Sequence, residues 1–411
     1  MIPKGWSSQK LSSVASIIDC KHRTPEYVKS GIPLVSPGTI KWGALDLISP
    51  VKRVTEEEYR SLMDHCVVEQ GDLVMSRNQS VGVVSYVDSK KPFVLGQDTV
   101  LIKAIHADWR FIYYTLQSDL VQRQIAKSAG GSTFSRINLS DIRALNIKTP
   151  AICEQDKISQ ILTAWDKAIS VTESLLANSQ QQKKALMQQL LTGKKRLLDE
   201  NGTRFSETWK LYALSELFQR VTTKNNGKSN NVVTISGQHG LIKQEDFFKK
   251  TVASDTLDGY FLLKKGQFAY NKSYSNGYPM GAIKRLNRYP EGVVTTLYIC
   301  FELTTPKKSC GDYWEHYFES GLLNNSLSQI AHEGGRAHGL LNVKPSDFFS
   351  LKVAVPGFEE QQKIASVLSA ADTEISTLEK KLACLKDEKK ALMQQLLTGK
   401  RRVKVDEAVA V

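Results

Sequence analysis

A twelve-residue sequence occurs twice in this chain, and no other feature constrains its fold as strongly. KKALMQQLLTGK spans Lys183–Lys194 and recurs unchanged, 206 residues later, at Lys389–Lys400. At the same offset, the stretches that start at Pro150 and at Pro356 share the pattern Pro-x-x-x-Glu-Gln-x-Lys-Ile. Self-similarity at a fixed offset is typical of a duplicated unit. The chain therefore consists of two copies of one unit, each with a variable part followed by a segment that both copies share.

The shared segments have the periodicity of long amphipathic helices. Apolar residues recur at alternating spacings of four and three, as in a coiled coil, although Ser179, Lys183 and Lys389 interrupt the series. Each segment has Glu in its first turn and ends at Gly193 or Gly399, before a basic run that suits the helix dipole. The residues expected to pair the helices are Ile158, Leu162, Trp165, Ile169, Leu176, Leu186, Leu190, Ile364, Leu368, Ile375, Leu378, Leu382, Leu392 and Leu396.

A helix of this length needs a partner for its apolar stripe. About 40 residues make a rod roughly 60 Å long, and a lone amphipathic helix is marginal in water. The nearest partner is the other copy. Because a globular domain separates the two helices in the chain, we expect them to pair antiparallel, with the globular domains at opposite ends and related by a pseudo-twofold axis. The alternative is two independent helices, each packed on its own domain.

The variable parts combine strands and helices. Runs of β-forming residues occur at Asp72–Met75, Val81–Val87 and Val293–Ile299. Amphipathic helices are expected at about Trp109–Lys127 and Tyr313–Gln329. The predicted fold class is α+β: two globular α/β domains separated by two long helices, conserved between the copies, that pack as an antiparallel coiled coil. The predicted boundaries are a first domain at 1–150, a central helix at 151–198, a second domain at 199–356, a C-terminal helix at 357–403 and a tail at 404–411.

Charge and cysteine content restrict the partners and the compartment. Lys and Arg total 55 against 42 Asp and Glu, and the net charge of +13 favours polyanionic partners, nucleic acid above all. The six cysteines are scattered without a Cys-x-x-Cys pair, which suits a reducing cytosol rather than a disulfide framework or a zinc ribbon. Met1–Lys10 lacks the apolar core of a signal peptide, and no run of about 18 apolar residues occurs. We therefore expect a cytoplasmic protein.

The sequence contains no constellation typical of a catalytic site. A P-loop, a Gly-x-Gly-x-x-Gly fingerprint and the Asn/Asp-Pro-Pro-aromatic motif of amino-methyltransferases are all absent. His332, Glu333 and His338 lack the spacing and the acidic partner of a metal site, so a polar loop is favoured. Asp347 and Lys352 faintly resemble a nuclease site, but the Ser-Asp pair recurs in the first copy, which favours a helix cap or turn. We predict no catalytic residue, no metal site and no cofactor bound by this chain.

Two loops in each variable domain carry side chains suited to reading bases and holding phosphates. They combine glycine and small polar residues with basic or amide side chains, at matching places in the two copies. Arg can bind guanine through two hydrogen bonds, and Asn or Gln can bind adenine in the same way. The alternative for each residue is an ordinary solvated turn. The residues predicted to contact DNA are Arg77, Asn78, Gln79, Ser132, Thr133, Ser135, Arg136, Asn271, Lys272, Tyr274, Asn276, Arg336 and His338.

Two variable domains that alternate with two near-identical helices resemble the specificity (S) subunits of type I restriction–modification enzymes. The openings at Pro150–Ile158 and Pro356–Ile364 and the Leu-Leu-Thr-Gly-Lys endings at Leu190–Lys194 and Leu396–Lys400 carry the resemblance, which covers essentially the whole chain.

The resemblance implies a non-catalytic subunit that reads duplex DNA. Each variable domain would be a target recognition domain for one half of a split site, and the helices would set the spacing and dock methyltransferase subunits, usually two. Those subunits would bring S-adenosylmethionine and methylate adenine. Restriction subunits, which are motor-nucleases, would use ATP and Mg²⁺ for translocation and cleavage in host defence. Two other functions stay open: a stand-alone enzyme that modifies or cleaves DNA, and an RNA-binding or purely structural coiled-coil adaptor.

Overall fold

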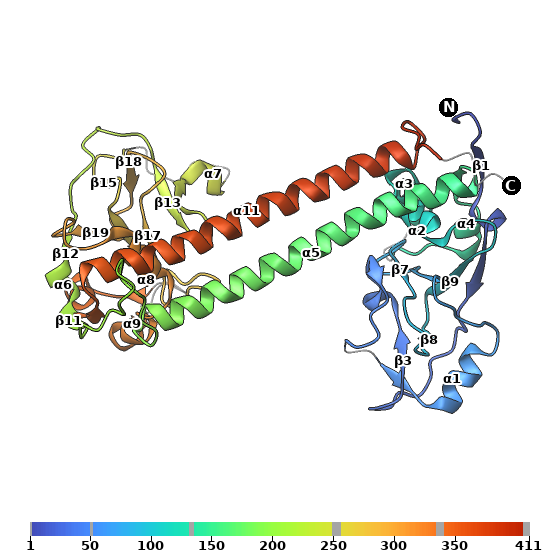
Figure 1. Cartoon of the computed structure of the whole chain (residues 1–411), viewed down its shortest axis with the longest axis horizontal. Coiled ribbons are helices and arrows are strands. Elements are labelled where there is room, and N and C mark those ends of the chain that lie inside the picture. Colours follow the sequence, from blue (N-terminus) through green and yellow to red (C-terminus); the bar gives the residue numbers. More distant parts are fainter. Residues whose placement is uncertain (1, 50–51, 131–134, 249–255, 334–340, 406–411) are drawn as a thin grey trace. The chain divides into compact units, whose positions relative to one another are not determined.

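The computed structural model describes residues 2–49, 52–130, 135–248, 256–333 and 341–405. The chain divides into two compact units: unit 1 contains Met1–Glu173 and Lys380–Val411, and unit 2 contains Ser174–Glu379. Each unit therefore combines one variable domain with one part of each long helix, α5 (Ile152–Leu190) and α11 (Phe358–Leu396) (Figure 1). Among the described residues, no helix is long and apolar enough to cross a membrane.

The variable domain of unit 1 is built on a main sheet of five strands. The strand bounds in unit 1 are β1 Ser7–Lys10, β2 Ala15–Asp19, β3 Ile32–Val35, β4 Gly43–Ala44, β5 Arg53–Val54, β6 Leu73–Ser76, β7 Val84–Tyr86, β8 Val94–Leu95, β9 Thr99–Ala104 and β10 Asn146–Thr149. The main sheet has the order β2-β9-β6-β7-β4, and a smaller one has the order β5-β3-β8. β1 pairs antiparallel with β10, which brings the start of the domain to the strand that leads into α5.

In unit 1, α2 and α4 pack on the main sheet and α1 packs on the smaller one. The helix bounds are α1 Glu56–Met63, α2 Trp109–Gln117, α3 Asp119–Ala129 and α4 Leu139–Arg143, with 3-10 turns at Leu11–Ser13 and Pro37–Thr39. The single helix expected over Trp109–Lys127 is wrong, because Ser118 is extended and ends α2. The Ser118 side chain then accepts a hydrogen bond from the Val121 amide and so caps α3. The expected strand Val81–Val87 is shorter, because Gly82 has a φ of +78° and β7 begins only at Val84.

Unit 2 repeats this plan. Its strand bounds are β11 Lys210–Ala213, β12 Phe218–Arg220, β13 Val233–Ser236, β14 Gly240–Lys243, β15 Phe261–Lys264, β16 Phe268–Asn271, β17 Ala282–Arg285, β18 Glu291–Val294, β19 Ile299–Leu303, β20 His332–Glu333, β21 Leu341–Asn342 and β22 Lys352–Val355. The sheet order β12-β19-β16-β17 corresponds to β2-β9-β6-β7, and β11 pairs with β22 as β1 pairs with β10. The single strand expected over Val293–Ile299 is wrong, because a turn closed by the Tyr298 amide and the Thr295 carbonyl separates β18 from β19.

The helices of unit 2 follow the same pattern of two short pieces in place of one. Their bounds are α6 Leu214–Leu217, α7 Gln244–Phe248, α8 Gly311–Glu319, α9 Asn324–Ile330 and α10 Pro345–Ser350. The single helix expected near Tyr313–Gln329 is interrupted, because Gly321 has a φ of +75°, which a helix interior does not permit. Trp314 of α8 is fully buried and packs edge-on against Phe218 in the core of the unit.

The antiparallel pairing of the long helices is confirmed within each unit (Figure 1). In unit 1, Glu154 in the first turn of α5 meets Arg402, just beyond the end of α11. In unit 2, Glu360 in the first turn of α11 meets Arg196, just beyond the end of α5. The alternative of two independent helices is wrong, because each hydrophobic core contains residues of both helices.

The residues expected to pair the helices fall into two groups. Six of them are fully buried in the two cores: Ile158, Leu162, Leu190, Ile364, Leu368 and Leu396. The other eight are partly buried: Trp165, Ile169, Leu176, Leu186, Ile375, Leu378, Leu382 and Leu392. The first group lies near the helix ends, so the ends of the helices belong to the hydrophobic cores of the domains. The second group includes the residues in the middle parts of the helices, where the helix contacts bury less of each side chain.

The repeated openings and endings of the helices form one cluster in each unit. In unit 2, Gly193 has a φ of +70°, which turns the chain out of α5 and brings Arg196 to Glu360. Arg196 donates from Nε and Nη2 to the two carboxylate oxygens at 2.6 and 2.7 Å, and Trp209 Nε1 donates to the same carboxylate at 3.2 Å. The corresponding residues of unit 1 are Gly399, Arg402, Glu154 and Trp6.

The lysines that interrupt the apolar series form ion pairs across the helices. Lys389 pairs with Asp166 in unit 1, and Lys183 pairs with Asp372 in unit 2. The two lysine side chains are only 15% and 16% exposed. Because each lysine reaches its carboxylate in one alignment of the helices, these pairs favour the observed register over a slipped one. Tyr114 of α2 also donates to Asp166, at 2.7 Å.

The residue that corresponds to Tyr114 in unit 2 is a histidine, and it should make unit 2 sensitive to acid. Burial lowers the pKa of His316, and Lys183 adds to this effect, although Asp372 opposes it. Because the pKa of His316 is lower in the folded chain, the unfolded chain binds more protons. The contribution of the neutral imidazole to the stability of unit 2 is therefore complete above about pH 6.5 and is lost as the pH falls through that value. Burial raises the pKa of Tyr114, so unit 1 has no such group at this place.

We therefore expect the stability of unit 2 to fall between about pH 6.5 and about pH 5, by more than that of unit 1. Chemical denaturation followed by circular dichroism across this range measures the effect. The matched variant is His316→Gln, which stays neutral and retains a group that can bond Ser369 Oγ, 3.0 Å from the imidazole Nε2. An acid-induced loss of the same size in the variant and in the wild-type protein would contradict the assignment to His316.

Candidate nucleic-acid interface

The two loops predicted to bind DNA in the first domain lie against each other. The Ile137 amide donates to the Arg77 carbonyl at 3.1 Å, and Asn78 and Arg136 form an isolated antiparallel bridge. Asp98 joins both loops, because its carboxylate lies 2.7 Å from Arg136 Nη2 and 3.5 Å from Asn78 Nδ2. The fold therefore brings together two predicted segments that are about sixty residues apart in the chain.

Arg77 supports these loops from inside. Its side chain is 6% exposed, and its guanidinium donates to Asp19 Oδ1 at 2.7 Å and to the Ile137 carbonyl at 3.1 Å. A side chain so enclosed is not presented to a ligand, which argues against the direct DNA contact predicted for Arg77. The buried ion pair instead holds the loop after β6 against the segment before α4.

The remaining described residues of these loops differ in exposure, and Ser76 is buried while Asn78 and Ser80 are partly buried. Gln79 is exposed and has a φ of +59°, and its amide donates to Asn78 Oδ1 at 2.6 Å, which fixes the turn. Ser135 and Arg136 are exposed as well. Ser132 and Thr133 lie outside the described residues. The loop therefore offers amide, hydroxyl and guanidinium groups on a backbone that internal bonds hold.

A third loop, at Ser36–Gly43, belongs to the same surface and is not among the loops predicted from the sequence. The Ser80 hydroxyl donates to the Pro37 carbonyl at 2.9 Å, which ties the third loop to the predicted one. Lys41 is exposed, and Trp42 is 41% exposed with its ring edge-on to Tyr113. The signal that was available is a Ser-containing turn after a buried apolar strand, which recurs at Ser236 in the second copy.

In the second domain, the residues that follow the second predicted loop contact the first predicted loop. The Leu341 amide donates to the Lys272 carbonyl at 3.0 Å, and Lys272 Nζ donates to the Val343 carbonyl at 3.5 Å. Partial burial and the nearby Arg220 lower the pKa of Lys272. Among the described residues, no carboxylate forms an ion pair with Lys272, in contrast to the pairing of Arg77 with Asp19 in unit 1.

The other predicted residues of the second domain differ in their availability. The Asn271 side chain accepts a hydrogen bond from the Ser273 amide at 3.1 Å, whereas Tyr274 is 63% exposed and Asn276 is exposed. Arg336 and His338 lie outside the described residues, and so do the side chains of His332 and Glu333. Asp347 lies in the first turn of α10, where an acidic side chain suits the helix dipole.

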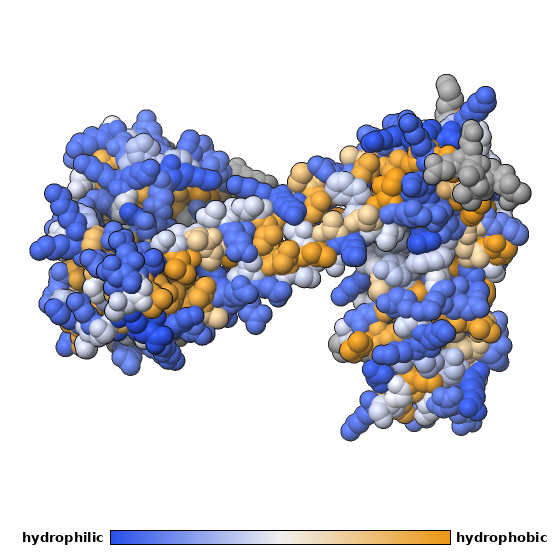
Figure 2. Space-filling view, viewed as in Figure 1, coloured by the Kyte–Doolittle hydropathy of each residue, from blue (hydrophilic) through white to orange (hydrophobic). Residues whose placement is uncertain are grey.

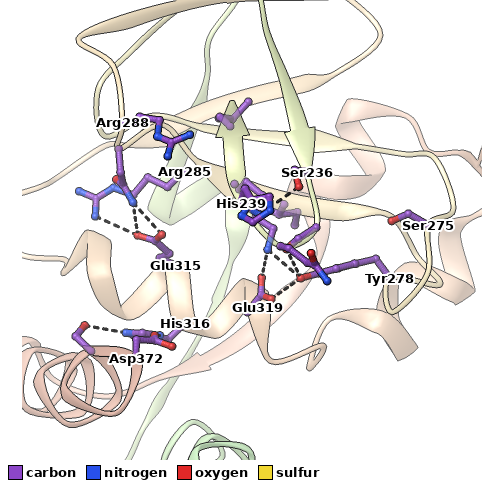
Figure 3. A pocket seen from close by; sticks show the side chains of 18 of the residues that line it. Ser236, His239, Ser275, Tyr278, Arg285, Arg288, Glu315, His316, Glu319 and Asp372 are labelled. Carbon is purple, nitrogen blue, oxygen red and sulfur yellow. Dashed lines mark hydrogen bonds and ion pairs between the residues drawn. The ribbon is translucent and has the colours of Figure 1, made fainter. Parts of the chain in front are cut away.

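A hollow of about 1110 Å³ opens beside these loops in unit 2 (Figure 3). The turn between β13 and β14, the loop after β16, α8 and parts of both long helices line it. Gln238 and His239 at the tip of the turn are exposed, as are Asn276 and Arg288. The turn corresponds in order along the chain to the third loop of unit 1, so each domain presents a turn of this kind beside its predicted loop.

One group of described residues has the spacing of a possible metal site. Ligand atoms of Asp19, Cys20 and His22 lie within 4.8 Å of one another. One carboxylate oxygen of Asp19, however, already accepts from Arg77 and from the Cys20 amide, and burial raises the pKa of the Cys20 thiol. Because thiolate is the form that binds metal, these contacts favour an ion-pair role for Asp19.

Comparison with known proteins agrees with this arrangement. Residues 3–178 match the model of the "Type I restriction modification DNA specificity domain". The putative type I restriction enzyme MjaX specificity subunit of Methanocaldococcus jannaschii is 24% identical, with 98% of this chain and 95% of that protein covered. The MjaIX specificity subunit of the same organism is 20% identical over the same shares of the two proteins.

Solved structures share the fold. The type I restriction–modification S subunit from M. genitalium has a TM-score of 0.59 at 17% identity, covering 96% of each chain. A chain from a study of complex assembly and conformational transition of the type I R-M system has a TM-score of 0.54 at 15% identity, covering 98% of this chain and 100% of that one.

The domain model matches the first copy, and the second copy repeats its sheet order, its helix-end cluster and its loop contacts. Residues 3–178 therefore match a type I restriction–modification DNA specificity domain, and nearly the whole chain is similar to type I specificity subunits.

Proposed function

We propose that this chain reads a bipartite DNA site for a type I restriction–modification complex, with each domain recognising one half. The single observation that carries the proposal is that equivalent backbone contacts, Ile137 with Arg77 and Leu341 with Lys272, hold the first predicted loop of each copy, while the exposed side chains differ. Equivalent scaffolds with different exposed groups suit two readers of different base sequences. The net charge of +13 supplies a grip on DNA that depends on salt.

We further propose that the long helices bind the partner subunits and set the distance between the half-sites. Exposed apolar residues on α5, such as Val171 and Leu175 at 51% and 49%, support a protein-binding role, and Figure 2 shows apolar residues along the visible face of the long helices. Methyltransferase subunits, two in the proposed complex, would supply S-adenosylmethionine for adenine methylation, and restriction subunits would supply ATP- and Mg²⁺-dependent cleavage. The proposal places the complex in the cytoplasm, with the DNA.

Mapping methylated adenines in a host with and without this gene, in the presence of its methyltransferase partner, tests the function. We expect one split motif, present only with the gene. A variant adds one heptad to each long helix, in α5 after Ser179 and in α11 before Glu374. These two residues are hydrogen-bonded to each other, so both helices lengthen at the same level. The half-sites should stay the same, and the spacer between them should change. Seven residues add roughly 10 Å to a helix, the rise of about three base pairs, so the effect on spacer preference is large.

Three results would contradict the proposal. A continuous motif, or an unchanged spacer in the insertion variant, would exclude the ruler function of the helices. Methylation or cleavage by the isolated chain would favour a stand-alone enzyme. Tighter binding of RNA than of duplex DNA that carries the split site would favour an RNA-binding adaptor.

A further inference from the structure

We propose that the turn Ser236–Gly240, between β13 and β14, makes base-specific contacts in the second recognition domain through Gln238 and His239. This inference rests on the proposed DNA-reading function and assigns part of the specificity to residues outside the two loops predicted from the sequence. Three properties of the turn support it: free side chains, a fixed backbone, and acidic neighbours on α8 that contact cations or amides.

The first property is that both side chains are free to meet a ligand. Gln238 and His239 are exposed, and neither side chain forms a hydrogen bond or ion pair with any described residue. Two residues of the predicted loop are already engaged: Asn271 accepts from the Ser273 amide, and Lys272 Nζ contacts the Val343 carbonyl. A side chain that reads a base edge needs its donors and acceptors available, so the turn is better placed for that role than Asn271 or Lys272.

The second property is a backbone that is held at both of its inner residues. Ser236 is 4% exposed, and its hydroxyl accepts a hydrogen bond from the His239 amide at 3.2 Å. The Tyr278 hydroxyl lies 2.8 Å from the Gly237 carbonyl. A Cβ on Gly237 would lie 2.7 Å from the Tyr278 ring, so this close approach requires glycine. Recognition groups that are held in place before binding lose less entropy when they bind.

Tyr278 is itself fixed by two charged residues. Lys284 Nζ donates to the Tyr278 hydroxyl at 2.9 Å, and both the lysine and the hydroxyl contact the Glu319 carboxylate of α8 (Figure 3). The second recognition domain therefore connects its predicted loop, its β13–β14 turn and its main helix through one hydrogen-bonded group. In unit 1 the Ser80–Pro37 hydrogen bond connects the corresponding loops more simply.

The third property concerns the acidic residues in the floor of the hollow. Glu319 pairs with Lys284, and Glu315 accepts two hydrogen bonds from Asn287 and lies 3.8 Å from Arg285. These pairings reduce the repulsion that the carboxylates would exert on DNA. Arg288 is exposed and, among the described residues, forms no ion pair, so it leaves a positive charge at the edge of the hollow for a phosphate.

The chemistry of the two side chains predicts what they read. The Gln238 amide presents one acceptor and two donors, which match N6 and N7 of adenine in the major groove. The His239 ring offers a donor and an acceptor, so it can bond either kind of purine edge. Gln238→Ala should therefore reduce discrimination at an A·T pair in one half-site by roughly 5- to 100-fold and leave the other half-site unchanged.

The experiment maps methylated motifs for the complete complex with wild-type chain, Gln238→Ala, His239→Ala and Gln238→Glu. Glutamate accepts hydrogen bonds and pairs with the cytosine N4 amino group, so Gln238→Glu should shift the preferred base at one position. An altered specificity cannot result from misfolding, and unfolding curves of each variant exclude the loss of unit 2. Gln329→Ala, on the exposed face of α9, is the matched control.

The outcomes separate the inference from the function on which it rests. A change confined to one half of the motif supports the inference. An unchanged motif in all three variants overturns it while leaving the specificity function intact. A wild-type complex that produces no split motif overturns the proposed function itself.

Discussion

Arg196→Ala should destabilise unit 2 by about 3–5 kcal/mol, the range measured when one partner of a buried ion pair is removed. The reason is the burial of Glu360, whose side chain is 2% exposed and lies in the first turn of α11. Arg196 satisfies both oxygens of this carboxylate with short hydrogen bonds, and Trp209 supplies one more. Without the guanidinium, a charge stays in the interior with a single neutral donor.

The repeat provides a matched control for this prediction. Arg402 makes the same two contacts with Glu154 in unit 1, but the Arg402 side chain is 46% exposed against 19% for Arg196. Water can replace an exposed guanidinium, so Arg402→Ala should cost only about 1–2 kcal/mol. Urea unfolding of the two variants measures both losses. Equal losses would show that burial of the cation does not determine the effect, and a negligible loss in Arg196→Ala would disprove the account.

The repeat made most of the fold predictable from the sequence. Periodicity located both long helices, and the need to cover their apolar stripes led to the antiparallel pairing that each unit contains. Lys183 and Lys389 interrupt the apolar series in the sequence, but each forms an ion pair with an aspartate of the other helix, Asp372 and Asp166 respectively. The spacing of apolar residues predicts which side chains are buried, but it does not predict ion pairs between two helices. The role of these lysines therefore became clear only from the structure.

Local signals failed where a single residue breaks an otherwise continuous pattern. The amphipathic pattern continues through Ser118, yet that residue caps a new helix, and a β-forming run continues through a turn at Thr295–Tyr298. Turns of this kind depend on one hydrogen bond, which composition does not reveal.

The candidate interface was predictable in part. The sequence matched Arg77 with Lys272, and both do occupy equivalent places, with their side chains directed at the carbonyls of Ile137 and Val343. Their roles were not predictable, because Asp19 lies 58 residues from Arg77 in the chain and only the sheet brings the two together. The turns that carry Trp42 and Gln238 were not predicted, because a serine-containing turn after an apolar strand does not distinguish a recognition loop from an ordinary turn.

Arg77 pairs with a carboxylate, whereas the equivalent Lys272 contacts only a carbonyl, and this difference leads to the second large effect. Arg77→Ala should destabilise unit 1 by about 2–4 kcal/mol, because Asp19 is 28% exposed and loses its strongest partner. The loop after β6 also loses its link to the segment before α4, so under the proposed function recognition of the first half-site should weaken strongly while recognition of the second is retained. Unfolding curves and motif mapping measure these two consequences.

Lys272→Ala should cost less than about 1 kcal/mol, since no described carboxylate is left unpaired and the repulsion from Arg220 is relieved. The double variant Asp19→Asn with Arg77→Ala should recover part of the stability lost in Arg77→Ala, because it removes the unpaired charge. If instead Lys272→Ala destabilised its unit as much as Arg77→Ala, or if Asp19→Asn gave no recovery, the internal ion pair would not be the reason that the first domain keeps its loops together.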